Sequence, residues 1–220
     1  MCGRLANTLP NDAMAQLFSA MPANALPEVP NYNVCPTTLV QVVTSDNELR
    51  RLGAMRWGFL PTWYKTPSDG PLLINARAET IAEKPAFRTA CRQRRCILPT
   101  TGFYEWNKDA EGNRLPWYFS RADESPLALA GIWQDWGTED PITTCAVVTT
   151  SASADIDHIH HRMPVILEQD DWAKWLGEDG HGAALLMRQA PKGTLKVHRV
   201  GRAVNSNRAS GPELIVPFDE

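Results

Sequence analysis

The sequence lacks the features of secreted, membrane-spanning and thiolate-metal proteins. Its 220 residues include five cysteines, an odd number with no C-x-x-C pair, which argues against a disulfide framework and a thiolate zinc site. No apolar run approaches the roughly 20 residues needed to cross a bilayer, and the start of the chain lacks the basic and apolar regions of a signal peptide. We therefore expect a cytoplasmic protein with reduced thiols.

The sequence also lacks an excess of positive charge. Its net charge of −3, taken alone, argues against a nucleic-acid binder. The charge is uneven, because residues 1–106 carry a net +3 and residues 107–220 a net −6, so a local basic groove is compatible with the composition. The length allows a substantial core and no obvious linker divides the chain, so we expect a single domain over residues 1–220.

The first four residues, Met1-Cys2-Gly3-Arg4, offer a reactive end. A small residue directly after the initiator Met favours removal of that Met, which would leave Cys2 with a free α-amine. The amine and the thiol have reference pKa values of about 8 and about 8.5, so each has a nucleophilic fraction near neutral pH. An aldehyde could form an imine with the amine, and the thiol could then close a five-membered thiazolidine. From these residues alone, a tolerated small residue at position 2 is the simpler interpretation.

Hydrophobic periodicity predicts a chain of mostly antiparallel strands with short helices. A helix is expected over residues 11–21, then an irregular proline-rich stretch over 22–36 and a β-hairpin over 39–57. A short buried strand over 72–74 and a helix over 85–94 come next. Further elements are expected as strands at 117–119, 127–133, 143–150 and 195–200 and as short helices at 170–176 and 183–188.

Several polar residues near predicted strands are candidates for catalysis. Asn75 directly follows the strand over 72–74, where a sheet edge presents side chains to a cleft. Glu105 stands among aromatic residues, so burial would raise its pKa and suit it to general acid or base chemistry, although the spacing also fits an exposed strand residue. In a strand, His158 and His160 would share one face and could hold a metal with a carboxylate. A third ligand is missing, which favours a catalytic histidine.

An aromatic loop lies between the hairpin and the strand over 72–74. Glycine and proline interrupt residues 57–64, Trp-Gly-Phe-Leu-Pro-Thr-Trp-Tyr, which excludes regular structure there. The loop could fold back onto the core, or it could present its aromatic rings, Trp63 among them, for stacking on bases. The sequence favours neither alternative.

The order of these segments resembles the SRAP family, named for SOS response-associated peptidases. The resemblance rests on M-C-G-R, W-G-F-L-P-T-W, N-A-R-A-E-T, R-R-C-I-L-P-T-T-G-F-Y-E-W, I-H-H-R-M-P-V-I-L and P-E-L-I-V-P, and it runs from Cys2 to Pro217. It implies an α+β fold whose curved, barrel-like, mostly antiparallel sheet is flanked by short helices and forms a groove for single-stranded DNA. It also implies that Cys2 traps the ring-opened aldehyde of an abasic site as a thiazolidine crosslink that shields the lesion.

The resemblance carries four functional positions onto this chain, namely Cys2, Asn75, Glu105 and His160. His160, with a reference pKa of about 6.5, can donate the proton that opens the sugar ring. Glu105 can take the proton of the α-amine and return one as water leaves, and Asn75 can orient the sugar hydroxyl or aldehyde. An imine acidifies the neighbouring carbon, so a weak β-elimination (AP lyase) activity is also expected.

Five further residues are expected to contact DNA. Arg4, Arg77 and Arg162 would hold phosphates, and Trp106 and Trp63 would stack on bases. The expected partner is single-stranded DNA that contains abasic sites, with neither a cofactor nor a metal. The chain is expected to be monomeric and, in a bacterium, to associate with the nucleoid.

Two positions depart from the family pattern. Cys35 stands where a small residue without a thiol is more usual, which would place a second thiol near the groove. His161 stands where an acidic residue is common, which leaves open the neighbour that tunes His160.

Three alternatives compete with DNA crosslinking. The first is the cysteine peptidase of the family name, in which Cys2 is the nucleophile, His160 the base and Asn75 part of an oxyanion site. Autoproteolysis of Met1 would be a limited activity of this kind. A non-catalytic single-strand binder is the second alternative. A metal hydrolase that uses His158 and His160 is the third.

Overall fold

The computed structural model describes residues 2–23 and 25–218. The strands are β1 (Leu5–Asn7), β2 (Met21–Pro22), β3 (Asn31–Val34), β4 (Leu39–Asp46), β5 (Leu49–Trp57), β6 (Asn75–Arg77), β7 (Arg95–Thr100), β8 (Gly102–Lys108), β9 (Arg114–Arg121), β10 (Leu127–Trp136), β11 (Ile142–Ser151), β12 (Arg162–Pro164) and β13 (Leu195–Arg199). The helices are α1 (Asn11–Leu17), α2 (Arg88–Gln93) and α3 (Trp172–Leu176), with the 3-10 turns η1 (Gln169–Asp171), η2 (Ala183–Leu186), η3 (Arg202–Asn205) and η4 (Pro212–Ile215). The predicted α+β class is confirmed.

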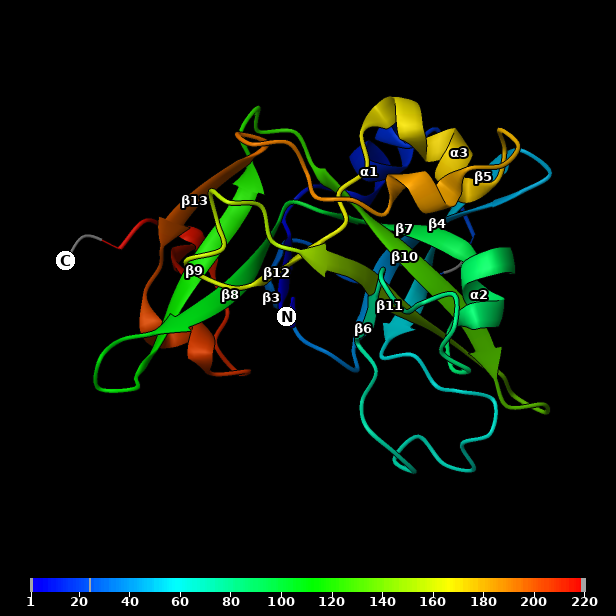
Figure 1. Cartoon of the computed structure of the whole chain (residues 1–220), viewed down its shortest axis with the longest axis horizontal. Coiled ribbons are helices and arrows are strands. Elements are labelled where there is room, and N and C mark those ends of the chain that lie inside the picture. The colour runs from blue at the N-terminus through cyan, green and yellow to red at the C-terminus, as the bar shows by residue number, and fades with distance from the viewer. Residues whose placement is uncertain (1, 24, 219–220) are drawn as a thin grey trace.

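The strands β4, β5, β7, β10 and β11 close into a barrel (Figure 1). Antiparallel pairing joins them in the order β11-β10-β7-β4-β5, and β5 then pairs parallel with β11, with Trp57 opposite Cys145. Because the last pairing returns to the first strand, the sheet curves back on itself. The expectation of a curved, barrel-like sheet is confirmed.

The central residues of β4, β7, β10 and β11 are buried on both faces of the sheet, and each face packs in a different core. Side chains alternate along a strand, so Val42 joins the core that contains Cys2, while Val43 joins the core beneath the helices. In the helical core, Phe18 of the α1 end stacks on Trp172 of α3 with ring centroids 4.2 Å apart. This burial on both sides explains the nearly continuous apolar runs of β4 and β11.

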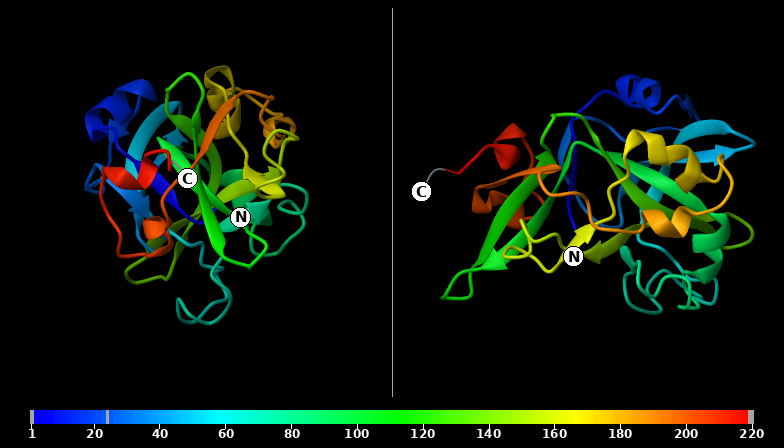
Figure 2. Two further views of the ribbon diagram at one scale, coloured as in Figure 1. Left: turned by 90° about the vertical axis from the view of Figure 1, so that its left-hand side faces the viewer. Right: turned by 45° about the horizontal axis from the view of Figure 1, so that its top comes forward.

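A second sheet, in the order β13-β9-β8-β1-β3, extends away from α2 (Figure 2). Only Thr101 separates β7 from β8, so the chain passes directly from the barrel into this sheet. Strand β1 lies between β8 and β3, with Leu5 opposite both Phe103 and Val34. The first described residues therefore run along the junction of the two sheets.

The N-terminal helix is shorter than the sequence predicts. Met14 and Phe18 are fully buried, as expected, but α1 ends at Leu17. Ser19 has a φ of +50°, a left-handed conformation that stops the helix before the proline is reached. Met21, predicted as part of the apolar stripe, is 59% exposed and pairs with β5 as part of β2.

The strand predicted over 72–74 is displaced by several residues. Leu73 makes only an isolated bridge with Phe59, whereas the regular strand is β6, in which Asn75 pairs with Val147 of β11. Backbone hydrogen bonds to β11 hold this polar segment in a strand, although its residues have little strand preference of their own. The candidate Asn75 consequently lies inside a sheet instead of after one.

The aromatic loop is buried at one end and exposed at the other. Trp57 and Phe59 are fully buried, so this end of the loop folds back onto the core. Trp63 is 57% exposed.

None of the helices in the described part of the chain is long and apolar enough to span a bilayer.

Candidate active site

Cys2 lies in the core between the barrel and the second sheet, and its side chain is buried. Burial raises the pKa of the Cys2 thiol, and the negative charge of Glu105 raises it further. The thiol is therefore neutral near pH 7. The predicted removal of Met1 concerns a residue outside the described part of the chain.

Asn75 holds the backbone of Cys2. Its Nδ2 atom donates a hydrogen bond of 2.9 Å to the carbonyl oxygen of Cys2. The position of Asn75 is set by the pairing of β6 with β11. Its Oδ1 atom is buried and has no hydrogen-bond partner among the described residues, so this acceptor is available to a ligand beside Cys2.

Glu105 projects into the protein from the middle of β8, where its residue pairs with Trp117 of β9. Its side chain is only 4% exposed, so Glu105 is a buried carboxyl and not the exposed strand residue that the spacing also allowed. Burial raises the pKa of Glu105 to about 7. A carboxyl group with this pKa can both accept and donate a proton near neutrality.

His160 faces Glu105 from the turn that precedes β12. The Nδ1 atom of His160 lies 3.9 Å from Oε1 of Glu105 and accepts a 3.0 Å hydrogen bond from the backbone N–H of Arg162. Burial lowers the pKa of His160, so the ring is mostly neutral at pH 7. The ring of His161 stacks on it with centroids 4.5 Å apart, and its charge also lowers the pKa of His160.

A cavity of about 260 Å³ opens beside these residues and is mostly basic. Its lining consists of Gly3, Arg4, Glu105, Trp106, Asn107, Lys108, Arg114 and His160. The guanidinium carbon of Arg114 lies 4.8 Å from the ring centroid of Trp106, and that of Arg4 lies 5.9 Å from it. Trp106 is further held by a 2.6 Å hydrogen bond from Nε1 to Asn205. The cavity therefore combines positive charge with a fixed aromatic ring.

Arg4, which was predicted as a phosphate contact, is buried except for a small part of its surface. It is 8% exposed, and its guanidinium donates to Asn33, to the carbonyl of Val204 at 3.0 Å and to Asn207 at 2.5 Å. These bonds fix Arg4 at the wall of the cavity. The thiol of Cys35 lies 3.4 Å from the carbonyl oxygen of Asn33, so it adjoins the residues that hold Arg4.

A second cavity, of about 520 Å³, is lined by three more of the predicted residues, Trp63, Asn75 and Arg77. Its lining consists of Trp63, Leu73, Asn75, Arg77, Thr80, Lys84, Pro85, Ala86 and Phe87. Asn75 belongs to this lining, while Gly3 and Glu105 belong to the first cavity. Asn75 is hydrogen-bonded to Cys2, and Cys2 directly precedes Gly3 in the chain. The buried cluster of Cys2, Asn75, Glu105 and His160 therefore lies between the two cavities.

A family model described as SOS response associated peptidase (SRAP) matches residues 1–207. The chain belongs to the SRAP family. The family inferred from the order of motifs is thereby confirmed.

Several relatives span nearly the full length of this SRAP chain. It is 34% identical over 223 residues to the abasic site processing protein YoqW of Bacillus subtilis (strain 168), covering 98% of this chain and 99% of the relative. It is 30% identical over 226 residues to the abasic site processing protein YedK of Escherichia coli (strain K12), covering 99% and 100%. A crystal structure of a protein from Bacteroides thetaiotaomicron has a TM-score of 0.86 at 25% identity, covering 99% and 100%.

The sequence interpretation of this SRAP chain missed three charged residues near the site. Lys108 and Arg114 face each other across the β8–β9 pairing and line the first cavity. Their positions in and beside the polar, glycine-containing segment over 107–113 were the available signal. Glu79, within N-A-R-A-E-T, binds Arg162, which was predicted as a phosphate contact.

The histidine-rich segment does not have the predicted strand geometry. His158 and His160 lie in the turns between β11 and β12, so they do not share a strand face. His158 is exposed, with its ring near Trp117. Across residues 2–23 and 25–218, no group of three His, Cys, Asp or Glu side chains is placed to hold a metal ion.

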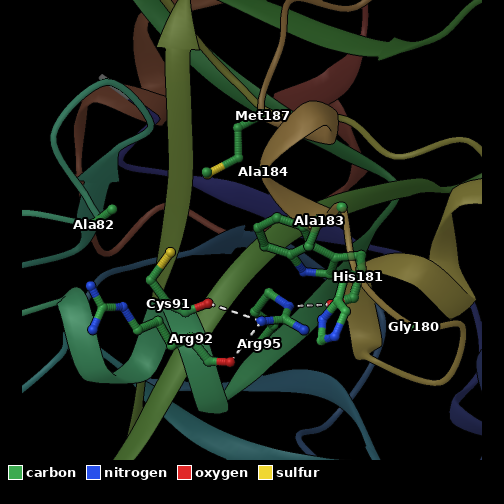
Figure 3. A pocket seen from close by; sticks show the side chains of 11 residues that line it. Ala82, Cys91, Arg92, Arg95, Gly180, His181, Ala183, Ala184 and Met187 are labelled. Carbon is green, nitrogen blue, oxygen red and sulfur yellow. Dashed lines mark hydrogen bonds between the residues drawn. The ribbon is translucent and has the colours of Figure 1, made fainter.

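A further cavity, of about 310 Å³, lies against α2, α3 and η2 (Figure 3). Arg95 donates from Nε to the carbonyl of Trp175 at 2.6 Å and from Nη1 to the carbonyls of Cys91 and Arg92. This arginine therefore ties α2 to α3. Within the described chain, the cavity shares no lining residue with the two cavities beside Cys2.

Proposed function

We propose that the protein processes abasic sites in single-stranded DNA by forming a covalent bond through Cys2 after Met1 has been removed. The observation that carries the proposal is the convergence of Asn75, Glu105 and His160 on a buried cysteine between two cavities that carry cations and aromatic rings. The names of the relatives YoqW and YedK support abasic sites as the lesion.

The crosslink forms by loss of one water and needs no oxidant or reductant. The α-amine of Cys2 adds to the C1 aldehyde of the open abasic sugar, and the carbinolamine loses water to give an imine. The Cys2 sulfur then adds to the imine carbon while its proton passes to the nitrogen, which closes the thiazolidine. The same imine acidifies the adjacent C2 position, so a slow β-elimination competes with ring closure.

Two side chains transfer protons, and a third orients the sugar. Glu105, whose pKa is raised to about 7 by burial, takes the ammonium proton and returns it to the departing hydroxyl of the carbinolamine. Neutral His160 exchanges a proton with the ring oxygen as the sugar opens. The unoccupied Oδ1 of Asn75 accepts a hydrogen bond from a hydroxyl of the bound sugar while Nδ2 holds Cys2.

The two cavities receive the DNA on either side of the lesion. Arg4, Lys108 and Arg114 attract phosphates to one, with Trp106 as a surface for a base. Arg77 and Trp63 play the corresponding roles in the other. In this proposal the chain acts as a monomer and as a single domain over residues 1–220, without a cofactor.

The thiol of Cys2 favours this reaction over peptide cleavage. Cysteine peptidases attack with a thiolate, but burial and the charge of Glu105 raise the pKa of the Cys2 thiol. An amine that attacks first removes the need for a preformed thiolate. Peptidase activity and simple strand binding remain the outcomes against which the proposal is tested.

The test incubates the processed protein with single-stranded DNA that contains one abasic site. We expect an SDS-resistant adduct whose mass is the sum of the two components less one water. The Cys2→Ala variant retains an α-amine after Met1 removal, so it should give an adduct only when borohydride reduces the imine. A chain whose Met1 is retained by an N-terminal extension should give none.

Two results would reject the proposal. One is a stable, borohydride-independent adduct with Cys2→Ala, which would exclude the thiazolidine. The other is cleavage of an unrelated peptide by the processed protein without any DNA adduct, which would favour the peptidase.

A further inference from the structure

Arg162 is held in a buried position by a half-exposed carboxylate. Its Nη1 and Nη2 atoms donate to the two carboxylate oxygens of Glu79 at 2.7 and 2.9 Å. Nη2 also donates to the carbonyl oxygen of Thr149 at 2.7 Å. The side chain of Arg162 is 10% exposed, whereas that of Glu79 is 49% exposed. Paired N–H···O bonds of this kind fix both distance and orientation.

This ion pair connects the two strands that flank β11 at the active site. Glu79 follows β6, which begins with Asn75, and Arg162 begins β12, directly after the turn that carries His160. The carbonyl of Thr149 accepts from the backbone N–H of Ala78 at 2.8 Å as well as from Arg162. The pair therefore spans β11 and joins the segment that holds Cys2 to the segment that presents His160.

The backbone of Arg162 extends the connection to the imidazole. Its N–H donates to Nδ1 of His160 at 3.0 Å, and this bond orients the ring toward Glu105. A shift of β12 would therefore move the His160 ring. Displacement of a reacting group by about 1 Å can slow a reaction by about a hundredfold.

We propose that Glu79 is a positioning residue for crosslinking, which keeps Asn75 and His160 in register by anchoring Arg162 across β11. This inference rests on the proposed function. Loss of the carboxylate would leave the buried guanidinium with Thr149 as its remaining partner among the contacts described above, and Arg162 Nε is already buried without a partner within the described chain. The guanidinium would then move toward solvent and carry the start of β12 with it.

A second ion pair supplies a matched control. Arg121 binds Glu168 through two bonds of 3.2 and 2.6 Å, with side-chain exposures of 18% and 44%. These residues line a different cavity with Leu17 and Trp172. Glu168→Ala therefore removes a similar half-exposed carboxylate from a partly buried arginine elsewhere in the fold, and Arg121 keeps its second carboxylate partner, Asp123, at 2.9 Å.

The experiment measures single-turnover crosslinking over a range of DNA concentrations. For Glu79→Ala we expect the rate constant at saturating DNA to fall about tenfold or more, while the half-saturating DNA concentration changes less than twofold. Glu79→Gln, which retains one hydrogen-bond acceptor, should recover part of the rate. Glu168→Ala should crosslink at the wild-type rate.

Three outcomes would overturn the inference. They are a wild-type rate constant in Glu79→Ala, a loss confined to the half-saturating concentration, and an equal loss of rate in Glu168→Ala. Failure of the proposed function is a distinct result, because the wild-type protein itself would then form no adduct.

Discussion

The side-chain amide of Asn75 donates a 2.9 Å hydrogen bond to the backbone carbonyl of Cys2, a residue 73 positions earlier in the chain. This bond links β6 to the segment that precedes β1 and fixes the direction in which the Cys2 backbone enters the core. The proposed nucleophile is thus positioned through its backbone carbonyl, and its thiol takes no part in this bond.

Removal of this bond should slow the chemistry more than the binding. For Asn75→Ala we expect the crosslinking rate constant at saturating DNA to fall by about tenfold to a hundredfold, since a hydrogen bond of this kind is worth about 1–3 kcal/mol when its buried partner is left unsatisfied. Single-turnover gels measure the rate. Asn113→Ala, in an exposed turn, is the control and should behave as wild type. An unaffected rate in Asn75→Ala would contradict a role in positioning.

The raised pKa of Glu105 predicts a pH dependence of crosslinking. As the pH rises through about 7, the carboxyl ionises and can accept the ammonium proton, so the rate constant should increase with a midpoint near 7. In Glu105→Gln the amine must lose its proton without this carboxylate, so the reaction should be slower and its midpoint should move toward the pKa of the amine, about 8. The measurement is the rate constant at saturating DNA from pH 5.5 to about 9. An unchanged midpoint would exclude Glu105 as the base.

The same carboxyl should make the folded state less stable at high pH. The pKa of Glu105 is raised on folding from an ordinary value of about 4.3 to about 7, so the folded state keeps the proton that the unfolded state loses. The resulting destabilisation is absent below pH 4, grows through this range and reaches about 4 kcal/mol above pH 7. Glu105→Gln should therefore exceed wild type in free energy of unfolding at pH 8 but not at pH 4. Urea unfolding at both values checks this, and an equal difference at both would contradict it.

Arg114 should contribute a charge to DNA binding. It lines the cavity beside Glu105, so Arg114→Gln should weaken binding and reduce the slope of log affinity against log salt by about 0.7 for single-stranded DNA. Fluorescence anisotropy at several salt concentrations gives the slope. Arg92→Gln, at the separate cavity near α2, removes the same charge and should leave the slope nearly unchanged. Equal slopes for both variants would place the phosphates elsewhere.

Trp63 should contribute stacking without supporting the fold. Its side chain is 57% exposed, so Trp63→Ala should change the melting temperature little. Loss of a stacked base should cost about 1–3 kcal/mol of binding free energy, similarly for all base sequences. Anisotropy titrations measure this cost, with Leu185→Ala, another exposed apolar residue, as the control. Wild-type affinity in Trp63→Ala would remove this residue from the binding surface.

The linear pattern predicted many elements well and failed where distant contacts override local preference. The hairpin around residues 45–47 follows from alternation and turn residues, and it appears as β4 and β5. The strand character of Asn75 does not follow from its neighbours, because it depends on backbone bonds to β11. The length of α1 depends on Ser19, whose left-handed backbone the periodicity did not indicate.

The sequence by itself determined the kind of chemistry available to this protein. A cysteine at position 2 and the side chains of Asn75, Glu105 and His160 are chemical groups whose reactivity follows from residue type, and the order of motifs determined the family. Tertiary structure alone decided their protonation and their partners. Burial raises the pKa of Glu105 and lowers that of His160, while β11 brings Glu79 to Arg162. Desolvation and strand register arise from residues far apart in the chain, so no local pattern contains them.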